Sequence, residues 1–167
     1  TGVSVGGLPD GIVDTDMLAT DAVTAAKIGS LPAGSILQVV SATKTDTQSF
    51  TSNQQADVTG LSVSITPSST NSKILVFGYV IGAWENNAAK IGIHLFRGST
   101  EILQGDAAGN RIRMAGFTYF AIAADSMIAM PFNYLDSPST TSATTYKIQA
   151  ENMDPQGTVY IKIGRAH

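Results

Sequence analysis

The sequence predicts an all-β fold, a jelly-roll-like antiparallel β-sandwich, and three observations support this prediction. From residue 35 onward, short apolar and β-branched runs alternate with turn residues, so that about eight to ten strands fit into roughly 130 residues. Several of these runs alternate apolar and polar side chains with a period of two. Nothing from residue 36 to residue 167 has a convincing helical period. A sandwich or jelly roll is the architecture that accommodates such a pattern.

Regular alternation marks three of the predicted strands, in residues 60–67, 146–151 and 157–164. A strand with one buried face places an apolar side chain at every second position. The residues at these positions are Leu61, Val63 and Ile65, then Tyr146, Ile148 and Ala150, and last Val159, Ile161 and Ile163. We therefore expect these side chains to point into the core. Residues 35–44, which are apolar and β-branched, predict a further strand.

Three other segments are apolar on both faces: residues 74–84, 114–124 and 127–135. The two sets of side chains in the first segment are Ile74, Val76 and Val80 on one side, and Leu75, Phe77, Tyr79 and Ile81 on the other. Because the outer face of a sandwich sheet meets water, outer apolar residues need a further partner. Either loops cover this face, or the strands are central in a compact barrel, or the face is a subunit interface. We favour the interface, since obligate interfaces resemble a domain core cut in half.

Residues 10–29 contain an apolar side chain at every fifth position, namely Val13, Leu18, Val23 and Ile28. A step of five residues turns about 500° around a helix axis, so these side chains share no helix face. A strand in a sheet needs a period of two. With so few apolar groups, the segment alone cannot offset the roughly 1–2 kcal/mol per residue that backbone ordering costs.

Two interpretations of this segment remain. It is either a flexible leader with a short helix from Thr15 to Lys27, or a repeat that becomes stable when identical copies meet around an axis. We favour the second, in which the four apolar residues lie on the axis of a homotrimer. The predicted domains are an N-terminal shaft and trimerisation segment, residues 1–34, and a β-sandwich head, residues 35–167.

Composition excludes several classes of function. A hydrophobic content of 43% with 14% charged residues indicates a folded protein. The net charge of −3 argues against nucleic acid as a partner, since nucleic acid selects clustered Lys and Arg. The chain has no cysteine, which excludes thiolate metal sites and disulfides. No apolar run reaches the 18 or so residues of a membrane span, so we expect no membrane insertion. The sequence begins at Thr1 rather than Met, and we expect further sequence upstream.

Candidates for catalysis are few. The two histidines, His94 and His167, have no spacing that would hold a metal. His94 falls on the face of its strand opposite Ile91, Ile93 and Leu95, which we expect to be the wetter face. A depolymerising site would need a carboxylate pair about 5–10 Å apart. The available acids show no diagnostic spacing; they are Glu85, Glu101, Asp106, Asp125, Glu151 and Asp154. We expect no enzyme activity, no metal site and no cofactor.

Two short segments could bind a receptor. The first is Trp84 with Glu85, Asn86 and Asn87, because an indole ring can stack on a sugar while amides and carboxylates bind its hydroxyls. The alternative, which we favour, is that Trp84 anchors the core or an interface and that the following residues form a turn. The second segment places Arg111 and Arg113 on one face, where they could meet anionic glycans or the carboxylates of a neighbouring subunit.

The sequence also contains phrases of a known type. They are "LPAGSILQVVSATKTDTQSFTS", "DVTGLSVSITPSSTNSKILVFGYV", "LFRGSTEI" and "LDSPSTTSATTYKIQAEN". Their order and spacing resemble a family of bacteriophage virion fibre domains, frequent in marine and cyanobacterial phages. The leader "TDAVTAAKIG" is similar to repeats in the fibre shafts that precede such domains. Members of the family usually continue after the "TVY" strand, whereas this chain ends at "IKIGRAH".

The resemblance implies a structural protein of the virion, a tail fibre or capsid fibre. It implies a homotrimer whose β-rich distal domain touches the host surface, a glycan or a protein, and whose N-terminal side joins other virion proteins. Such a protein is made in the host cytoplasm and acts outside the cell. Two alternatives from the residues stay open: an extracellular carbohydrate-binding module, and a polysaccharide-depolymerising tail spike domain.

Overall fold

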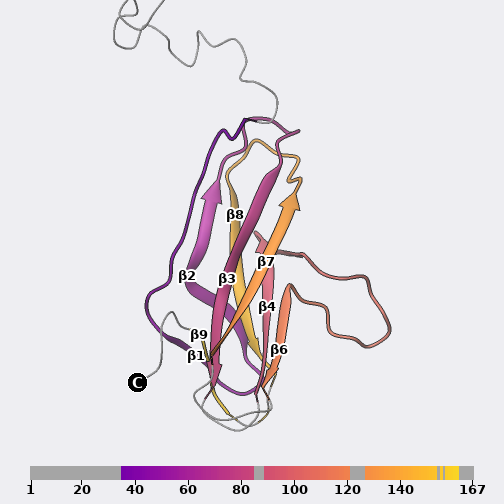
Figure 1. Ribbon diagram of the computed structural model, residues 1–167. Coiled ribbons are helices and arrows are strands. Elements are labelled where there is room, and N and C mark those ends of the chain that lie inside the picture. The colour runs from indigo at the N-terminus through magenta and orange to yellow at the C-terminus, as the bar shows by residue number, and fades with distance from the viewer. Residues whose placement is uncertain (1–34, 85–88, 121–126, 154, 156, 162–167) are drawn as a thin grey trace, which may run out of the picture. The chain divides into compact units, whose positions relative to one another are not determined.

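The computed structural model describes residues 35–84, 89–120, 127–153, 155 and 157–161 (Figure 1). The chain separates into two units, Thr1–Leu37 and Gln38–His167, and the fold described below belongs to the second. The predicted axis residues Val13, Leu18, Val23 and Ile28 lie outside the described residues. The homotrimer axis and the predicted division after residue 34 therefore stay predictions.

The described part of the chain contains nine strands, within the predicted number. They are β1 (Gln48–Phe50), β2 (Gln55–Ile65), β3 (Ile74–Trp84), β4 (Ala89–Arg97), β5 (Thr100–Ile102), β6 (Gly116–Phe120), β7 (Met127–Asp136), β8 (Thr144–Asn152) and β9 (Val159–Ile161). This confirms the all-β class.

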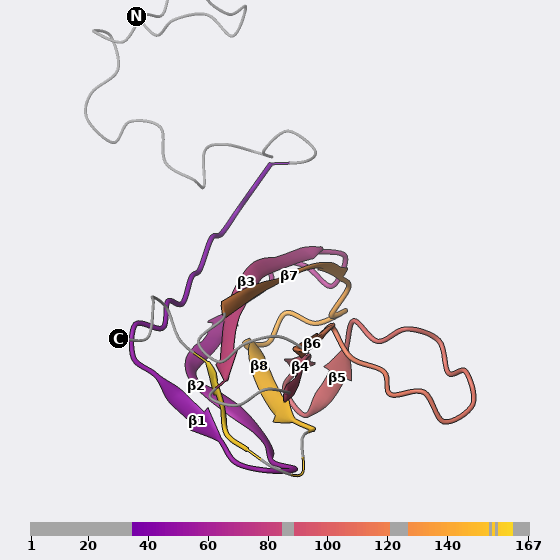
Figure 2. The same ribbon diagram turned by 60° about the horizontal axis from the view of Figure 1, so that its bottom comes forward.

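The strands form two antiparallel sheets that pack as a sandwich. Sheet A has the order β1-β9-β3-β7, and sheet B has the order β2-β8-β4-β5. β6 also belongs to sheet B, because it pairs with the first half of β4 while β5 pairs with the second half. Figure 2 shows β3 and β7 in one layer, with β8, β4 and β5 in the other. The predicted antiparallel sandwich is confirmed, whereas the jelly-roll connectivity stays a prediction.

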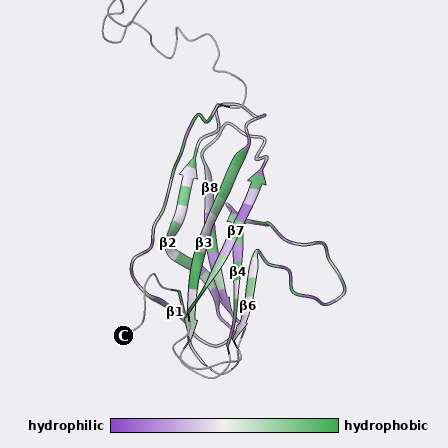
Figure 3. Cartoon of the chain, viewed as in Figure 1, coloured by the Kyte–Doolittle hydropathy of each residue, from purple (hydrophilic) through white to green (hydrophobic). Residues whose placement is uncertain are grey.

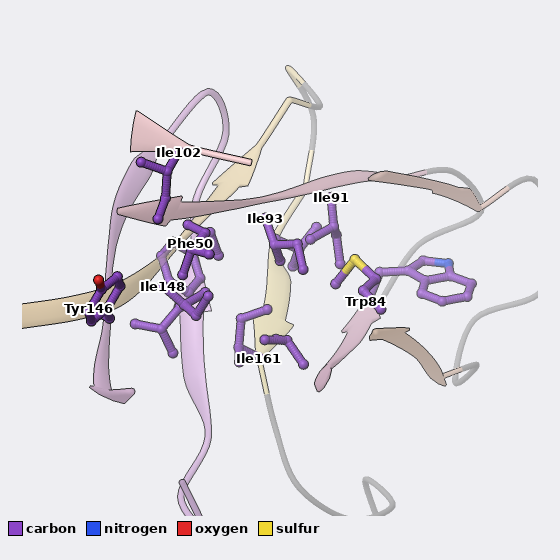
Figure 4. Packing of buried hydrophobic residues seen from close by; sticks show 14 of the residues in the cluster. Phe50, Trp84, Ile91, Ile93, Ile102, Tyr146, Ile148 and Ile161 are labelled. Carbon is purple, nitrogen blue, oxygen red and sulfur yellow. The ribbon is translucent and has the colours of Figure 1, made fainter. Parts of the chain in front are cut away.

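The core lies between the two inner faces (Figure 4). Ile91, Ile93 and Leu95 of β4 are almost fully buried, as are Phe50 and Val159. Removing each such side chain from water contributes about 1.5–3 kcal/mol. The inward residues predicted in β2, β8 and β9 are confirmed as buried or as packed against this cluster, apart from Ile163, which lies outside the described residues.

Glycine lets large side chains of β4, in the opposite layer, and of the neighbouring strand β7 approach β3 closely. A Cβ atom on Gly82 would lie 2.8 Å from Cδ1 of Ile91 and 3.2 Å from Cε of Met130. A Cβ on Gly78 would lie 3.1 Å from the ring of Phe132, its partner on β7. β3 is therefore apolar on its inner face and narrow there at Gly78 and Gly82, where neighbouring side chains fill the space.

A buried polar cluster ties the two sheets together. The Nη1 atom of Arg97, on β4, donates to both carboxylate oxygens of Asp136, on β7, at 2.9 and 3.0 Å. The hydroxyl of Tyr146, on β8, donates to the same carboxylate at 2.6 Å. Burial, and then the hydrogen bond to Asp136, raise the pKa of the Tyr146 phenol, so it stays neutral. Asp136 thus joins one strand of sheet A to two strands of sheet B.

The strand predicted over residues 35–44 is wrong, since this segment has no regular secondary structure. Side chains from this segment and from β1 bind the exposed backbone of β2 instead. Lys44 Nζ donates to the carbonyl of Thr59 at 3.0 Å, and the amide of Gln48 exchanges hydrogen bonds with the backbone of Thr59 and Asp57. These contacts satisfy backbone groups at the β2 edge that a neighbouring strand would otherwise bind.

Candidate functional site

The outer face of sheet A presents a row of large apolar side chains to solvent. Leu75, Phe77 and Tyr79 alternate along β3 and are 60%, 73% and 63% exposed, and Leu135 of β7 is 60% exposed. Leu75 pairs directly with Leu135 in the ladder. We call these four residues the β3–β7 face. Figure 3 shows the predominantly hydrophobic character of β3.

The exposure of the β3–β7 face bears on the three possibilities predicted for residues 74–84: a covering loop, a compact barrel and a subunit interface. The segment over residues 74–84 is apolar on both sides, as predicted. Its outer side chains Leu75, Phe77 and Tyr79 are exposed, whereas Ile81 is half-buried and Ala83 is buried. The covering loop and the closed barrel are thus wrong for these four residues. The two aromatic rings alone expose about 250 Å². The largest contiguous apolar patch on a typical monomer covers roughly 300–600 Å² and is often functional, and larger patches mark interaction sites.

A second exposed surface begins in the loop between β5 and β6. This loop, residues 103–115, is called the arm below, and Figures 1 and 2 both show it extending away from the sandwich. Ile112 is 68% exposed, between the exposed Arg111 and Arg113. The backbone N–H of Arg111 donates to the carbonyl of Ala108, and the guanidinium of Arg113 donates to the carbonyl of Gly105, both at 3.4 Å. These contacts fold the arm back on itself.

The arm is held at both ends. Leu103 packs against the core with a φ of 58°, a left-handed conformation that is rare for a bulky residue. Met114 lies over Gly92, where a Cβ atom would be 2.8 Å from its sulfur, and the N–H of Ala115 donates to the carbonyl of Ile93 at 2.9 Å. The fold therefore sets the positions at which the arm leaves and rejoins the sandwich.

The arm continues into β6, which exposes two aromatic rings on sheet B. Phe117 is 53% exposed and Tyr119 is 55% exposed. The ammonium of Lys90 lies 5.9 Å from the centroid of the Tyr119 ring, within the range of a cation–π contact. Ile112, Phe117 and Tyr119 together are called the arm surface.

The rest of the outer face of sheet B is mostly polar, with Phe96 of β4 half-buried there beside Lys147. His94 of β4 lies between two carboxylates, with Nδ1 2.6 Å from Glu101 Oε1 and Nε2 3.1 Å from Glu151 Oε2. His94 occupies the predicted outer face, but the prediction that it is wet is wrong, because the residue is only 3% exposed. The imidazole thus links β4 to β5 and to β8 across the outer face of the sheet.

A second polar network lies beside it. Asp57 of β2 accepts from Lys147 Nζ at 2.9 Å and from the side-chain amide of Gln149 at 2.7 Å. The hydrogen bond from Lys147, and then that from Gln149, lower the pKa of the Asp57 carboxyl. Gln149 also accepts from the amide of Gln55 at 2.9 Å.

The residues predicted to bind a receptor do not form one cluster among the described residues. Trp84 is 4% exposed and belongs to the core cluster, as in the interpretation favoured from the sequence (Figure 4). Its ring is therefore closed to a sugar in this structure. Glu85, Asn86 and Asn87 lie outside the described residues. Arg111 and Arg113 lie on the arm, and receptor binding by any of these residues stays a prediction.

Small ligands have little room beside the β3–β7 face. A groove of about 180 Å³ lies between residues 42–44 and the edge of β3, with Leu61, Tyr79 and Ile161 in its walls. Sites for small molecules usually enclose roughly 300–1,000 Å³. Within the described residues, no three His, Asp or Glu side chains gather as a metal site. No helix in that part of the chain is long and apolar enough to cross a membrane.

Comparison with solved structures shows a likeness to a viral protein. No family model matches the chain, and no curated protein matches it. The chain is similar to a chain in the structure of infectious bursal disease virus, Gx strain, with 14% sequence identity and a TM-score of 0.36. The match covers 79% of this chain but only 33% of the viral chain. A likeness of this degree carries no conclusion about function.

Proposed function

We propose that this chain is the subunit of a homotrimeric virion fibre, whose β-sandwich head adheres to the host cell surface. Its role is mechanical and adhesive, without catalysis or a cofactor. The phrases that resemble phage fibre domains support the virion assignment. The β3–β7 face supports the association of identical subunits.

The β3–β7 face is the observation that carries this proposal. Its four side chains are each about two thirds exposed, although the same strand pair is well packed on its inner side. Covering them with a second chain stabilises the complex by about 1–2 kcal/mol for each side chain. A chain that keeps such a face on its longest strand pair is adapted to association.

Firm adhesion to the host comes from the simultaneous binding of several heads. A single head offers a small contact with a host glycan or protein, which by itself is weak. Three heads on one fibre, and several fibres on one particle, convert later contacts into intramolecular ones and raise the avidity by about 10²- to 10⁴-fold. The N-terminal side, residues 1–34, would join the fibre to other virion proteins.

The first test of the proposal is the mass of the particle in solution. Sedimentation velocity and light scattering at micromolar concentration should give three times the chain mass of 17.4 kDa. Phe77→Glu places a charge in the β3–β7 face and should yield monomers. Ser64→Glu places the same charge on an exposed position of β2 and should leave the trimer intact. A wild-type monomer at micromolar concentration would count decisively against the proposal.

The second test addresses adhesion. Fluorescently labelled protein is incubated with cyanobacterial cells before and after their surface polysaccharide is removed. We expect binding to the intact cells that falls at least tenfold after stripping, and no oligosaccharide in the supernatant. Released oligosaccharide would instead support the depolymerising spike. Equal binding by the trimer and by the Phe77→Glu monomer would contradict the role of avidity.

A further inference from the structure

A cyclic trimer and a twofold dimer differ in which surfaces of their subunits meet. In a dimer with twofold symmetry the same patch can meet itself, whereas in a threefold ring identical residues meet only beside the axis, and each contact away from the axis joins two different patches. A β3–β7 face that lies away from the axis of the proposed homotrimer is therefore one of two complementary surfaces. The second must lie elsewhere on the same chain.

We propose that the β3–β7 face of one copy is covered by the arm surface of the next copy. The occupant is thus a second copy of this chain, through Ile112 of the arm and Phe117 and Tyr119 of β6. Each subunit gives its arm to one neighbour and receives the arm of the other. This inference rests on the proposed trimer and adds the interface that closes it.

The position of the arm supports this assignment. The arm extends away from its own sandwich (Figures 1 and 2), and the contacts of Arg111 and Arg113 named above fold it on itself. An isoleucine that is 68% exposed between two exposed arginines contributes nothing to the core of its own chain. In a neighbouring copy the same side chain would meet an apolar surface.

The chemistry of the two surfaces is complementary. The β3–β7 face offers leucines and two exposed aromatic rings, and the arm surface offers an isoleucine and two aromatic rings. Aromatic pairs at such contacts stabilise the complex beyond the burial of their area. The guanidinium groups of Arg111 and Arg113 can stack on Phe77 or Tyr79 of the neighbour, since a planar cation binds an aromatic face without needing a carboxylate.

The anchoring of the arm reduces the cost of association. Leu103 is held in the core at one end, and Met114 and Ala115 are held against β4 at the other. A loop whose two ends are fixed loses less conformational freedom when it binds than a free tail does. The unusual backbone angle of Leu103 is consistent with an arm whose direction is maintained by the fold.

Cysteine cross-linking tests the pairing directly, because the natural chain has no cysteine. The double variants Phe77→Cys/Ile112→Cys and Leu135→Cys/Ile112→Cys are oxidised and run on a denaturing gel without reductant. Bonds between the face of one copy and the arm of the next should give covalent trimers in at least one of them. The single variants should remain as single chains. Ser64→Cys/Ile112→Cys is the matched control and should also remain as single chains.

A second measurement does not depend on disulfide geometry. Ile112→Asp changes an exposed residue and should leave the circular dichroism spectrum unchanged. It should weaken the trimer at least tenfold in sedimentation equilibrium. Asp106→Asn, also exposed on the arm, should leave the association constant within twofold.

The outcomes separate this inference from the proposed function. A stable trimer with no cross-link in either pair, and with an unchanged constant for Ile112→Asp, overturns the arm contact but leaves the fibre subunit in place. Cross-linked dimers from Phe77→Cys alone overturn it too, because the face would then meet itself. A wild-type monomer overturns both.

Discussion

Apart from the exposed aromatic rings of β6, the outer faces of the two sheets meet water in opposite ways. On sheet B, neighbouring strands carry charged and amide side chains that bind one another, as in the contacts of His94 with Glu101 and Glu151. On sheet A, the corresponding positions of β3 and β7 carry Leu and aromatic residues that bind nothing within the described chain. Both sheets share one well-packed core. This difference indicates that packing of the inner faces is sufficient for the fold. Each outer face is adapted to its surroundings.

The largest expected effect on stability comes from removing the Asp136 carboxylate, whose contacts join the two sheets. Asp136→Ala leaves the Arg97 guanidinium and the Tyr146 hydroxyl without their shared acceptor inside the sandwich. We expect the free energy of unfolding to fall by about 3 kcal/mol, as in other buried ion pairs that lose one partner. Urea unfolding followed by circular dichroism measures it, with Asp106→Ala of the arm as the control. A loss below about 1 kcal/mol would mean that the sheets are held together by apolar packing alone.

A smaller effect distinguishes the outer faces themselves. His94→Ala leaves Glu101 and Glu151 facing each other across an empty space, and charge-assisted hydrogen bonds of this kind contribute about 1.5–3 kcal/mol. We expect a loss of about 2 kcal/mol, measured by urea unfolding in the monomeric Phe77→Glu background. In that same background Leu75→Ser on sheet A should change stability by less than about 0.5 kcal/mol. Equal losses of stability for His94→Ala and Leu75→Ser would contradict the difference inferred between the two outer faces.

Much of the fold follows from the sequence because a strand has a simple period. Alternation alone identifies the inward residues of β2 and β8, and the failure of alternation over residues 74–84 predicts an uncovered apolar face. Propensity fails over residues 35–44, where β-branched residues form no ladder because side chains such as Lys44 already bind the backbone of β2.

The contacts at the candidate site are harder to predict, because the residues that contact one another there are far apart in the sequence. Glu101 and Glu151 are 7 and 57 residues from His94, and only the pairing of β4 with β5 and β8 brings them together. No sequence motif identifies the arm surface, because it is recognised from the exposure of Ile112 in the structure. A useful signal in the sequence is an isoleucine flanked by two arginines within a loop rich in glycine and alanine.

The smallest effect concerns acid and the polar network of sheet B. The Asp57 carboxyl has its pKa lowered by hydrogen bonds from Lys147 and then Gln149, so the ionised form is favoured in the folded state. Its contribution to stability is thus complete above the ordinary pKa of Asp, 3.8, and is lost as the pH falls through the lower folded pKa. Because the side chain is 54% exposed, solvent screening limits this contribution to less than about 1 kcal/mol.

Asp57→Asn should therefore lower stability slightly at pH 7 and should flatten the acid limb of the stability profile below about pH 4. Urea unfolding between pH 2 and pH 7 measures both, again in the Phe77→Glu background so that dissociation does not contribute. The conservative control is Asp106→Asn, an exposed acid on the arm. If Asp57→Asn and the control have the same acid limb, the network does not stabilise the sheet. The polarity of sheet B would then serve to keep its outer face in water, while the apolar face of sheet A still requires a partner.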